Sequence, residues 1–357
     1  MTSQRVRAAV VGSGYWGPNI IRNFWEMPDV DLVGIADLNR NLLERVAERY
    51  RTVDVFTTDY RELLELDLDA VAICTPPETH HAIASDFLMS EHHVLVEKPL
   101  TVSATTAADL AIKAEHADRI LMVGHTFEYN QAVRDLKGII DSGELGRILY
   151  IDGVRVGLGL FHPTLNVIWD LAPHDISILN YLTGTMPSDV SARGAACVHE
   201  DVADVAYLTL NYPNGMTANT RMSWLDPLKT RRITVVGSEK MVVYDDVEPM
   251  EKLRIFDKRV TTIRRTDTYG DFQFAYHYGS VVSPHIHFEE PLRVECRQFI
   301  ESIRTGKAPT SDGASGLRVV QVIEAAQKSL ADSGAPTDVN TMSARDLIES
   351  TSGQAAR

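Results

Sequence analysis

The sequence predicts an α/β protein with a doubly wound parallel sheet first and an antiparallel sheet covered by helices second. Over the first 124 residues, β-branched runs alternate with helix-length segments, which is typical of a parallel sheet flanked by helices. After residue 125 a two-residue alternation of apolar and polar side chains replaces that rhythm, as in half-buried strands. A length of 357 residues allows roughly two domains. We therefore assign 1–124 to a first domain and 125–357 to a second.

The first domain contains six strand-sized segments. Helix-length segments such as 18–26 and 80–90 lie between them, each with apolar residues on one face. Six strands in this rhythm make one doubly wound domain. The predicted strands are 7–11, 31–36, 53–56, 70–74, 93–97 and 120–124.

The second domain opens with a predicted helix at 131–142 and continues with alternating strands. In 216–224, Met216, Ala218, Met222 and Trp224 face one way, toward the core, whereas Asn219 and Arg221 face the other, as expected of an antiparallel sheet covered on one side. Two apolar helix stripes follow near the C-terminus, at 292–303 and 319–330. We expect these helices to cover the apolar face of the sheet.

Composition and charge exclude several classes of protein. A net charge of -14 and a pI near 5.3 argue against a nucleic-acid partner, and no apolar run approaches the roughly 20 residues that span a bilayer. The three cysteines are far apart, which suits a reducing, cytoplasmic environment and neither a disulfide framework nor zinc. Three histidine pairs could suggest a metal, but none has a convincing third and fourth ligand, so we predict no metal site. They are His80 with His81, His92 with His93, and His285 with His287.

A glycine motif predicts a dinucleotide site. The run Gly12-Ser13-Gly14-Tyr15-Trp16-Gly17 follows the first strand and opens the first helix. In such a turn the first glycine permits the tight bend, the second admits a pyrophosphate and the third lets helix and strand pack closely. Asp37 closes the second strand, twenty residues beyond Gly17, where a carboxylate accepts hydrogen bonds from ribose hydroxyls and repels a 2'-phosphate. We predict that Tyr15 and Trp16 contribute to the same site and that NAD is the cofactor.

Two further motifs carry groups suited to proton transfer. Lys98 follows the fifth strand within Glu97-Lys98-Pro99, at the sheet edge where ligands of open α/β sheets bind. In the second domain, Asp170 and His174 precede an apolar helix, and Pro173 suits a first helical turn. We expect Asp170 and His174 to lie close together at that helix start.

Taken together, these motifs resemble those of the glucose-fructose oxidoreductase, inositol dehydrogenase and rhizopine-catabolism (Gfo/Idh/MocA) family over nearly the whole chain. The resemblance implies a Rossmann domain followed by an α/β domain with a large, open, mainly antiparallel sheet. It also implies hydride transfer between a nicotinamide cofactor and a sugar or cyclitol. By similarity, Lys98 lies near the nicotinamide, and Asp170 and His174 complete the catalytic set. By similarity, the cofactor cleft is lined by Thr75, Pro76, His80 and Glu97. The motifs that carry the resemblance are the glycine turn, Cys74-Thr75-Pro76-Pro77 with His80, Glu97-Lys98-Pro99, and Asp170 with His174.

Oxidation of an alcohol needs a base near the hydroxyl proton. A positively charged nicotinamide ring favours the neutral, basic form of a neighbouring amine, which makes Lys98 one candidate. His174 is the other, because a helix N-terminus favours a neutral imidazole and Asp170 orients it. Residues expected to reach a sugar ring are Tyr129, His162, Asn166 and Trp169.

The function expected from these observations is an NAD-dependent dehydrogenase or reductase acting on a secondary hydroxyl of a nucleotide-linked hexose, at carbon 3. The alternatives are a free sugar or cyclitol dehydrogenase, a redox-assisted glycosidase, and a regulator that senses NAD without turnover. The substrate is a small molecule, with no nucleic acid or membrane as partner. The polar sheet face with Asn219, Arg221 and Ser223 is expected to contact another subunit in a homodimer or homotetramer.

Overall fold

The computed structural model describes residues 5–163, 165–264 and 272–355, and the chain divides into two compact units. Unit 1 contains Met1–Tyr129, Glu289–Glu324 and Thr341–Arg357, and unit 2 contains Asn130–Phe288 and Ala325–Asn340. Unit 1 therefore extends slightly past residue 124 and includes two segments from the C-terminal part of the chain. Within the described ranges, no helix combines the length and the apolar content needed to cross a bilayer.

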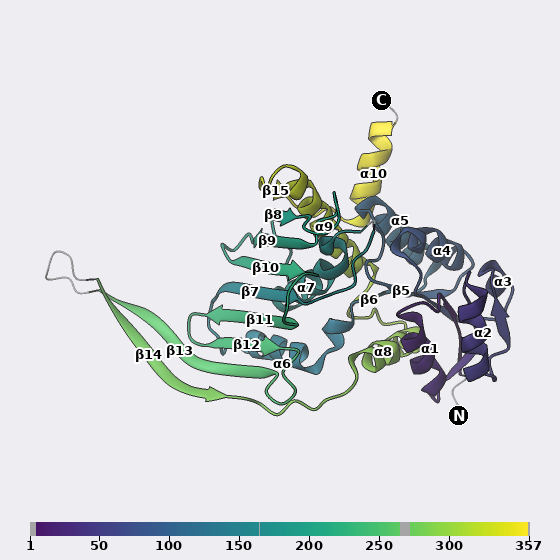
Figure 1. Ribbon diagram of the computed structural model, residues 1–357, viewed down its shortest axis with the longest axis horizontal. Helices are drawn as coiled ribbons and strands as arrows, with labels where there is room; N and C mark the ends of the chain where they lie inside the picture. Colours follow the sequence, from purple (N-terminus) through teal and green to yellow (C-terminus); the bar gives the residue numbers. More distant parts are fainter. Residues whose placement is uncertain (1–4, 164, 265–271, 356–357) are drawn as a thin grey trace. The chain divides into compact units, whose positions relative to one another are not determined.

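Unit 1 is built on a six-stranded sheet with the order β3-β2-β1-β4-β5-β6, in which every pair of neighbours is parallel. The predicted doubly wound sheet is confirmed, with strand bounds within one or two residues of those expected (Figure 1). The strands are β1 (Val6–Val11), β2 (Val30–Ala36), β3 (Val55–Thr57), β4 (Ala70–Ile73), β5 (His93–Glu97) and β6 (Leu121–Gly124). The other elements are α1 (Gly17–Glu26), α2 (Arg40–Arg49), α3 (Arg61–Leu64), α4 (Pro77–Met89), α5 (Ala104–Ala117), the 3-10 helix η1 (Thr126–Tyr129), α8 (Pro291–Thr305) and α10 (Ala344–Ala355).

The core of unit 1 includes a helix from far along the chain. Helix α8 packs against α1, where the rings of Phe24 and Phe299 stack with centroids 6.4 Å apart. Leu292, Cys296 and Ile300 are buried in the same cluster. The expectation that the stripe at 292–303 covers the second domain's sheet is therefore wrong, since apolar periodicity gives the buried face of a helix but not its partner.

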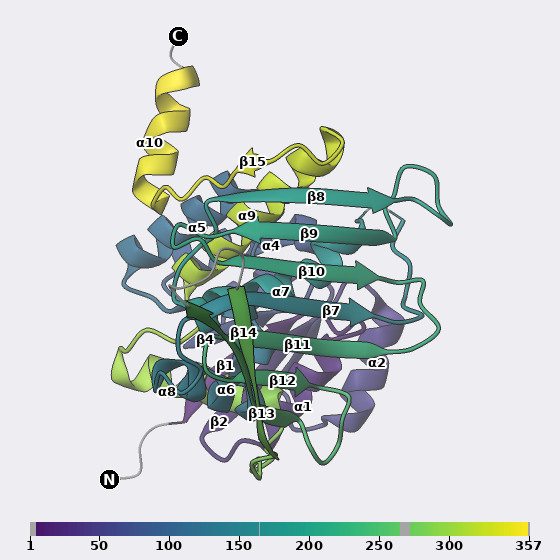
Figure 2. The same ribbon diagram turned by 90° about the vertical axis from the view of Figure 1, so that its left-hand side faces the viewer.

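Unit 2 contains a nine-stranded sheet with the order β14-β13-β12-β11-β7-β10-β9-β8-β15 (Figure 2). Only β7 and β10 pair in parallel among these strands, so the predicted mainly antiparallel sheet is confirmed. The strands are β7 (Ile148–Val156), β8 (Asp189–Ala195), β9 (Val205–Asn211), β10 (Thr217–Ser223), β11 (Thr230–Gly237), β12 (Met241–Asp245), β13 (Leu253–Arg264), β14 (Phe272–Val282) and β15 (Thr337–Asp338). The helices are α6 (Gln131–Asp141) and α7 (Val167–Thr183), and α9 (Gly313–Ala331) contributes residues to both units.

Helix α7 covers one face of this sheet, with contacts to β7, β9 and β10. In β10 the predicted alternation is confirmed, because Ala218 and Met222 are fully buried while Asn219 and Arg221 keep part of their surface exposed. The ribbon of β13 and β14 extends beyond the other strands of the sheet (Figure 1). The sheet thus has one face buried under α7 and one open face.

Candidate functional site

The glycine turn of unit 1 has the geometry that a dinucleotide requires. Gly12 has a φ of +96°, and a Cβ there would stand 2.7 Å from the backbone carbonyl of Cys74. A Cβ on Gly17 would come within 2.0 Å of the Gly12 carbonyl oxygen, whereas one on Gly14 would meet nothing within 4 Å. The first and third glycines are therefore needed for close packing. The second leaves open space in front of the N-terminus of α1, whose N–H groups suit a phosphate.

Asp37, directly after β2, stabilises the glycine turn by hydrogen bonds. Its Oδ2 accepts hydrogen bonds from the Ser13 backbone N–H at 2.6 Å and from the Ser13 hydroxyl at 2.8 Å. Its Oδ1 accepts from the Asn39 N–H at 2.7 Å. An ionised carboxylate has about four acceptor sites, so these bonds are compatible with the predicted contact to ribose hydroxyls.

His80, the fourth residue of α4, is fully buried. Its Nε2 lies 2.8 Å from the carbonyl oxygen of Thr75, and its Nδ1 lies 2.9 Å from that of Pro99. Thr75 is half-buried and Pro76 is exposed. The ring of His80 therefore contacts the two segments that follow β4 and β5, whereas Thr75 and Pro76 remain the residues predicted to face a cofactor.

Lys98 stands beside Glu97, a half-buried acid at the end of β5 whose Oε1 atom is buried. The backbone N–H of Lys98 donates to Oε2 of Glu97 at 3.2 Å. Burial raises the pKa of Glu97 to about 7, against the opposing effects of the Lys98 charge, the Lys98 N–H and the Trp16 side chain. Directly after β6, burial and the charge of Lys98 lower the pKa of His125 to about 3. Near pH 7, His125 is therefore neutral and Glu97 is partly protonated, so the neighbours of Lys98 carry little charge.

Sequence reasoning missed Glu295, an acid on α8 with no exposed surface. Burial, reinforced by the charge of Glu97, raises its pKa well above the ordinary value. Two carboxyl groups of unit 1 therefore interact behind the lysine-bearing turn. The signal was available, because Glu295 interrupts an apolar helix stripe at 292–303.

In unit 2, Asp170 and His174 both belong to α7. The expectation that Pro173 occupies the first helical turn is wrong, because α7 begins at Val167 and contains Pro173 inside it. The Asn166 side chain, which accepts from the N–H groups of Ile168 and Trp169, caps the helix earlier than predicted. Asp170 and His174 consequently lie one turn apart on the same face, and both are half-buried.

Trp224, which sequence reasoning assigned to the core, orients Asp170. Its indole Nε1 donates to Oδ2 of Asp170 at 2.9 Å. The rings of Phe161 and His162 lie 5.6 and 5.8 Å from the Trp224 ring. The exposed His162, predicted to contact a sugar, therefore belongs to the same aromatic group as the residue that holds Asp170.

A buried ion pair joins α7 to the sheet one residue beyond His174. Asp175 accepts from Nε of Arg155 on β7 at 2.8 Å and from the Thr220 hydroxyl on β10 at 3.1 Å. Arg155 and Asp175 are 5% and 3% exposed. This pair fixes the rotation of α7 about its axis, and with it the direction of Asp170 and His174.

Two of the predicted sugar-binding side chains make structural hydrogen bonds. Asn166 caps α7 and also donates from Nδ2 to Oε1 of Gln327 at 2.9 Å. Tyr129, in unit 1, is 1% exposed and its hydroxyl lies 2.8 Å from Oγ of Ser311. Burial raises the pKa of Tyr129. Trp169 is half-buried on α7, so it and His162 are the candidates whose surface remains available.

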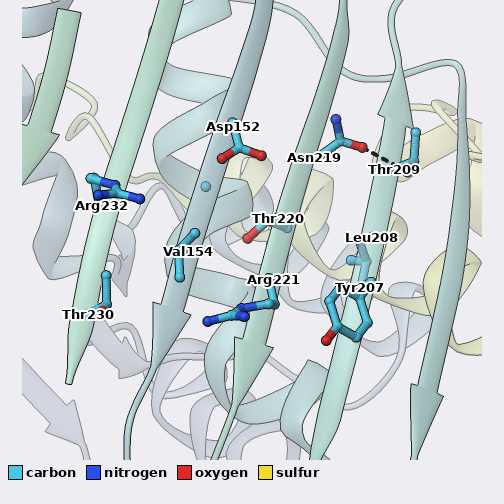
Figure 3. Close-up of a pocket in the computed structure, with 11 residues that line it drawn as sticks. Asp152, Val154, Tyr207, Leu208, Thr209, Asn219, Thr220, Arg221, Thr230 and Arg232 are labelled. Atoms are coloured by element: carbon cyan, nitrogen blue, oxygen red, sulfur yellow. Dashed lines mark hydrogen bonds between the residues drawn. The ribbon is translucent and has the colours of Figure 1, made fainter. Parts of the chain in front are cut away.

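The open face of the unit 2 sheet carries a hollow of about 630 Å³. Figure 3 shows its lining on four adjacent strands, with Asn219 hydrogen bonded to Thr209 at 2.8 Å. Side chains of both charges line it, among them Asp152, Arg221 and Arg232. Its position opposite α7 separates it from the face that carries Asp170 and His174.

The parallel sheet and the glycine turn of unit 1 together define a dinucleotide-binding protein. Two family models match the chain, the oxidoreductase family with an NAD-binding Rossmann fold at residues 6–125 and the GFO/IDH/MocA C-terminal domain at residues 133–243. The chain belongs to the Gfo/Idh/MocA family, which confirms the predicted resemblance. It is an NAD-dependent oxidoreductase that acts on CH–OH groups.

Relatives within the family act on different substrates. The chain is 27% identical to the UDP-N-acetylglucosamine 3-dehydrogenase of Acidithiobacillus ferrooxidans, over 88% of this chain and 94% of that protein. It is 24% identical to the myo-inositol 2-dehydrogenase of Thermotoga maritima, over 91% and 96% of the two chains. The structure of GenD2 from gentamicin A biosynthesis, in complex with NAD, has the same fold, with a TM-score of 0.80, 22% identity and 96% and 98% coverage.

Proposed function

We propose that this oxidoreductase acts on a secondary hydroxyl of a nucleotide-linked hexose, at carbon 3. The observation that carries the proposal is the position of Lys98, which follows β5 at the same sheet edge as the open glycine turn. Bound NAD supplies the acceptor for the hydride that leaves the carbinol carbon. The 27% identity to a UDP-N-acetylglucosamine 3-dehydrogenase supports both the nucleotide sugar and carbon 3.

In the proposed reaction, a base of the protein takes the hydroxyl proton as hydride leaves the adjoining carbon. Lys98 and His174 are the two candidate bases. Asp170, held by the indole of Trp224, orients the imidazole one turn along α7. Because the buried surroundings of Lys98 contain a protonatable carboxyl group, Glu97, the proton taken by the amine has a neighbouring acceptor.

Replacing the lysine tests this role directly. Lys98→Ala should lower kcat by roughly 10²-fold or more, the range of general acid-base catalysis, while the Kd for NADH changes little. Lys113→Ala is the matched control, because this lysine lies on α5 and pairs with Asp109. Undiminished turnover by Lys98→Ala would show that the amine has no part in the chemistry.

The substrate class is tested by a panel of UDP-, GDP- and dTDP-hexoses followed through NADH formation. The proposal expects a kcat/KM at least about 100-fold higher on one of these than on myo-inositol, since the nucleotide contributes binding energy that a cyclitol lacks. The second candidate, a cyclitol dehydrogenase, is favoured by the 24% identity to a myo-inositol 2-dehydrogenase. The reverse preference would establish it.

We also propose that the open sheet face is a contact between subunits of a homodimer or homotetramer. Asp152 and Arg221 give this face both charges, and Tyr207 on it is 53% exposed. Arg221→Glu should lower the molar mass measured by light scattering at micromolar protein, and a wild-type monomer there would contradict the proposal.

The cysteines of the described chain are unbridged, which fits the proposed cytoplasmic location.

A further inference from the structure

His80 connects two backbone segments that belong to different strand ends. Its ring is fully buried and stands between the carbonyl oxygens of Thr75, after β4, and Pro99, after β5, at 2.8 and 2.9 Å. Both distances are those of good hydrogen bonds. A single side chain therefore lies within hydrogen-bond distance of both segments.

Each carbonyl oxygen faces a different ring nitrogen of His80, that of Thr75 facing Nε2 and that of Pro99 facing Nδ1. Carbonyl oxygens only accept, and a neutral imidazole carries one N–H. Burial lowers the pKa of His80, although hydrogen bonds to the carbonyls of Thr75, Pro99 and Leu100 and the nearby charge of Glu78 oppose this. A neutral ring donates to one carbonyl at a time, so one tautomer holds the Thr75 segment and the other holds the Pro99 segment.

Each of these segments has its own task. A Cβ on Gly12 would stand 3.0 Å from the Thr75 backbone nitrogen, so the Thr75 segment packs directly against the turn that takes the pyrophosphate. The Pro99 segment follows Lys98 without an intervening residue. The partners of His80 thus lie on the cofactor side and on the lysine side of unit 1.

We propose that His80 is a positioning residue that couples the glycine turn to the lysine-bearing turn, each ring nitrogen controlling one of them. Occupation of the glycine turn should then favour the tautomer that holds the Thr75 segment and loosen the backbone around Lys98, even when no nicotinamide is present. This coupling affects catalysis only if Lys98 has the role in proton transfer proposed above. The coupling itself is measured by binding and amide exchange, so it fails or survives independently of any turnover assay.

Two substitutions separate the nitrogens. His80→Gln places an amide N–H near Nε2 and preserves the donor to Thr75, and His80→Asn places one near Nδ1 and preserves the donor to Pro99. Loss of one hydrogen bond corresponds to about a tenfold change at most. His80→Gln should keep the Kd for NADH within about threefold and speed amide exchange of Lys98, Leu100 and Thr101 about tenfold. His80→Asn should do the opposite, with NADH binding weakened about tenfold.

The matched controls are His81→Gln and His81→Asn, since the neighbouring ring is partly exposed and pairs with Asp109 at 2.6 Å. Neither control should change NADH binding or exchange at Lys98. Equal effects of the two His80 variants on both readouts, or no effect of either, would overturn the proposal, because a merely structural histidine does not distinguish its nitrogens.

The wild-type chain gives a second test if the variants do not fold. ADP-ribose, which lacks the nicotinamide, should slow exchange around Gly12 and Gly14 and speed exchange at Leu100 and Thr101, measured by mass spectrometry on the full-length protein. Unchanged or slower exchange at Leu100 and Thr101 would show that His80 does not couple the two turns in this way and that the proposal is wrong.

Discussion

The two units hold their candidate functional residues in different ways. In unit 1, Asp37, Thr75 and Lys98 lie on turns after strands and are fixed by short polar contacts, such as the bonds from Ser13 to Asp37. In unit 2, Asp170 and His174 lie on one helix, which a buried ion pair between Arg155 and Asp175 fastens to the sheet. Unit 1 therefore uses several modest hydrogen bonds, many of them to the backbone, whereas unit 2 uses one strong contact between charged side chains.

This difference predicts how each unit responds to damage. Loss of one contact at a turn removes about 1 kcal/mol and affects one residue. Removal of one partner from a buried ion pair leaves an uncompensated charge in the interior. Helix α7 of unit 2 should therefore lose its position as a whole, whereas unit 1 should lose its contacts one at a time.

The strongest test removes half of the ion pair. Asp175→Asn should lower the free energy of unfolding by about 3–5 kcal/mol, because the Arg155 guanidinium stays buried with its charge uncompensated. Urea denaturation measures the change. Replacing both partners, with Arg155→Met and Asp175→Leu, should recover most of the loss. A decrease below about 1 kcal/mol in the single variant would remove the contrast between the units.

The next test uses pH and Glu97. The folded chain keeps this proton up to about pH 7, whereas the unfolded chain releases it near the ordinary pKa of 4.5. Since the folded state binds more protons between these values, the free energy of unfolding should fall as pH rises from 4.5 to 7, by up to about 3 kcal/mol from this group. Glu97→Gln should flatten that slope in urea titrations. An unchanged slope would mean that the carboxyl group is already ionised at low pH.

A smaller effect separates the glycines of the turn. Gly17→Ala should destabilise unit 1 by about 1–3 kcal/mol, because its Cβ would meet the Gly12 carbonyl oxygen at 2.0 Å. Gly14→Ala should leave stability unchanged and weaken NADH binding about tenfold, since the added methyl group occupies only the space predicted for the pyrophosphate. Melting temperatures and NADH fluorescence titrations measure the two effects. Equal loss of stability in both variants would contradict this division of roles.

The smallest effect concerns Tyr129. Tyr129→Phe removes the hydrogen bond to Ser311 and should lower stability by about 1 kcal/mol while KM for the sugar stays constant. Trp224→Phe should instead raise KM, because it removes the donor to Asp170. If Tyr129→Phe raises KM with stability unchanged, the original prediction that Tyr129 contacts the sugar is correct.

The sequence was most informative where a function depends on neighbours along the chain. The three glycines, Asp37 and the Glu97-Lys98 pair are local patterns, and the parallel sheet followed from the rhythm of the first 124 residues. Asp170 and His174 were identified from their place before an apolar helix and from the family resemblance. The start of their helix was misplaced, because Pro173 was interpreted as a first-turn residue while Asn166 supplies the cap.

Long-range partners left little trace in the sequence. Trp224 had the appearance of a core residue in an alternating strand, and nothing local connects it with Asp170, 54 positions away. The same holds for Glu295, whose burial beside Glu97 depends on α8 packing in unit 1. Such contacts are decided by tertiary packing, which periodicity does not encode.

The packing of Phe299 on Phe24 has a consequence for synthesis on the ribosome. At about 10 residues per second, roughly half a minute separates translation of these two rings. During that interval the nascent Rossmann domain has no α8 to cover the apolar side of α1. This interval is when a chaperone has its best opportunity to bind, and a chain truncated before Pro291 would keep that surface bare permanently.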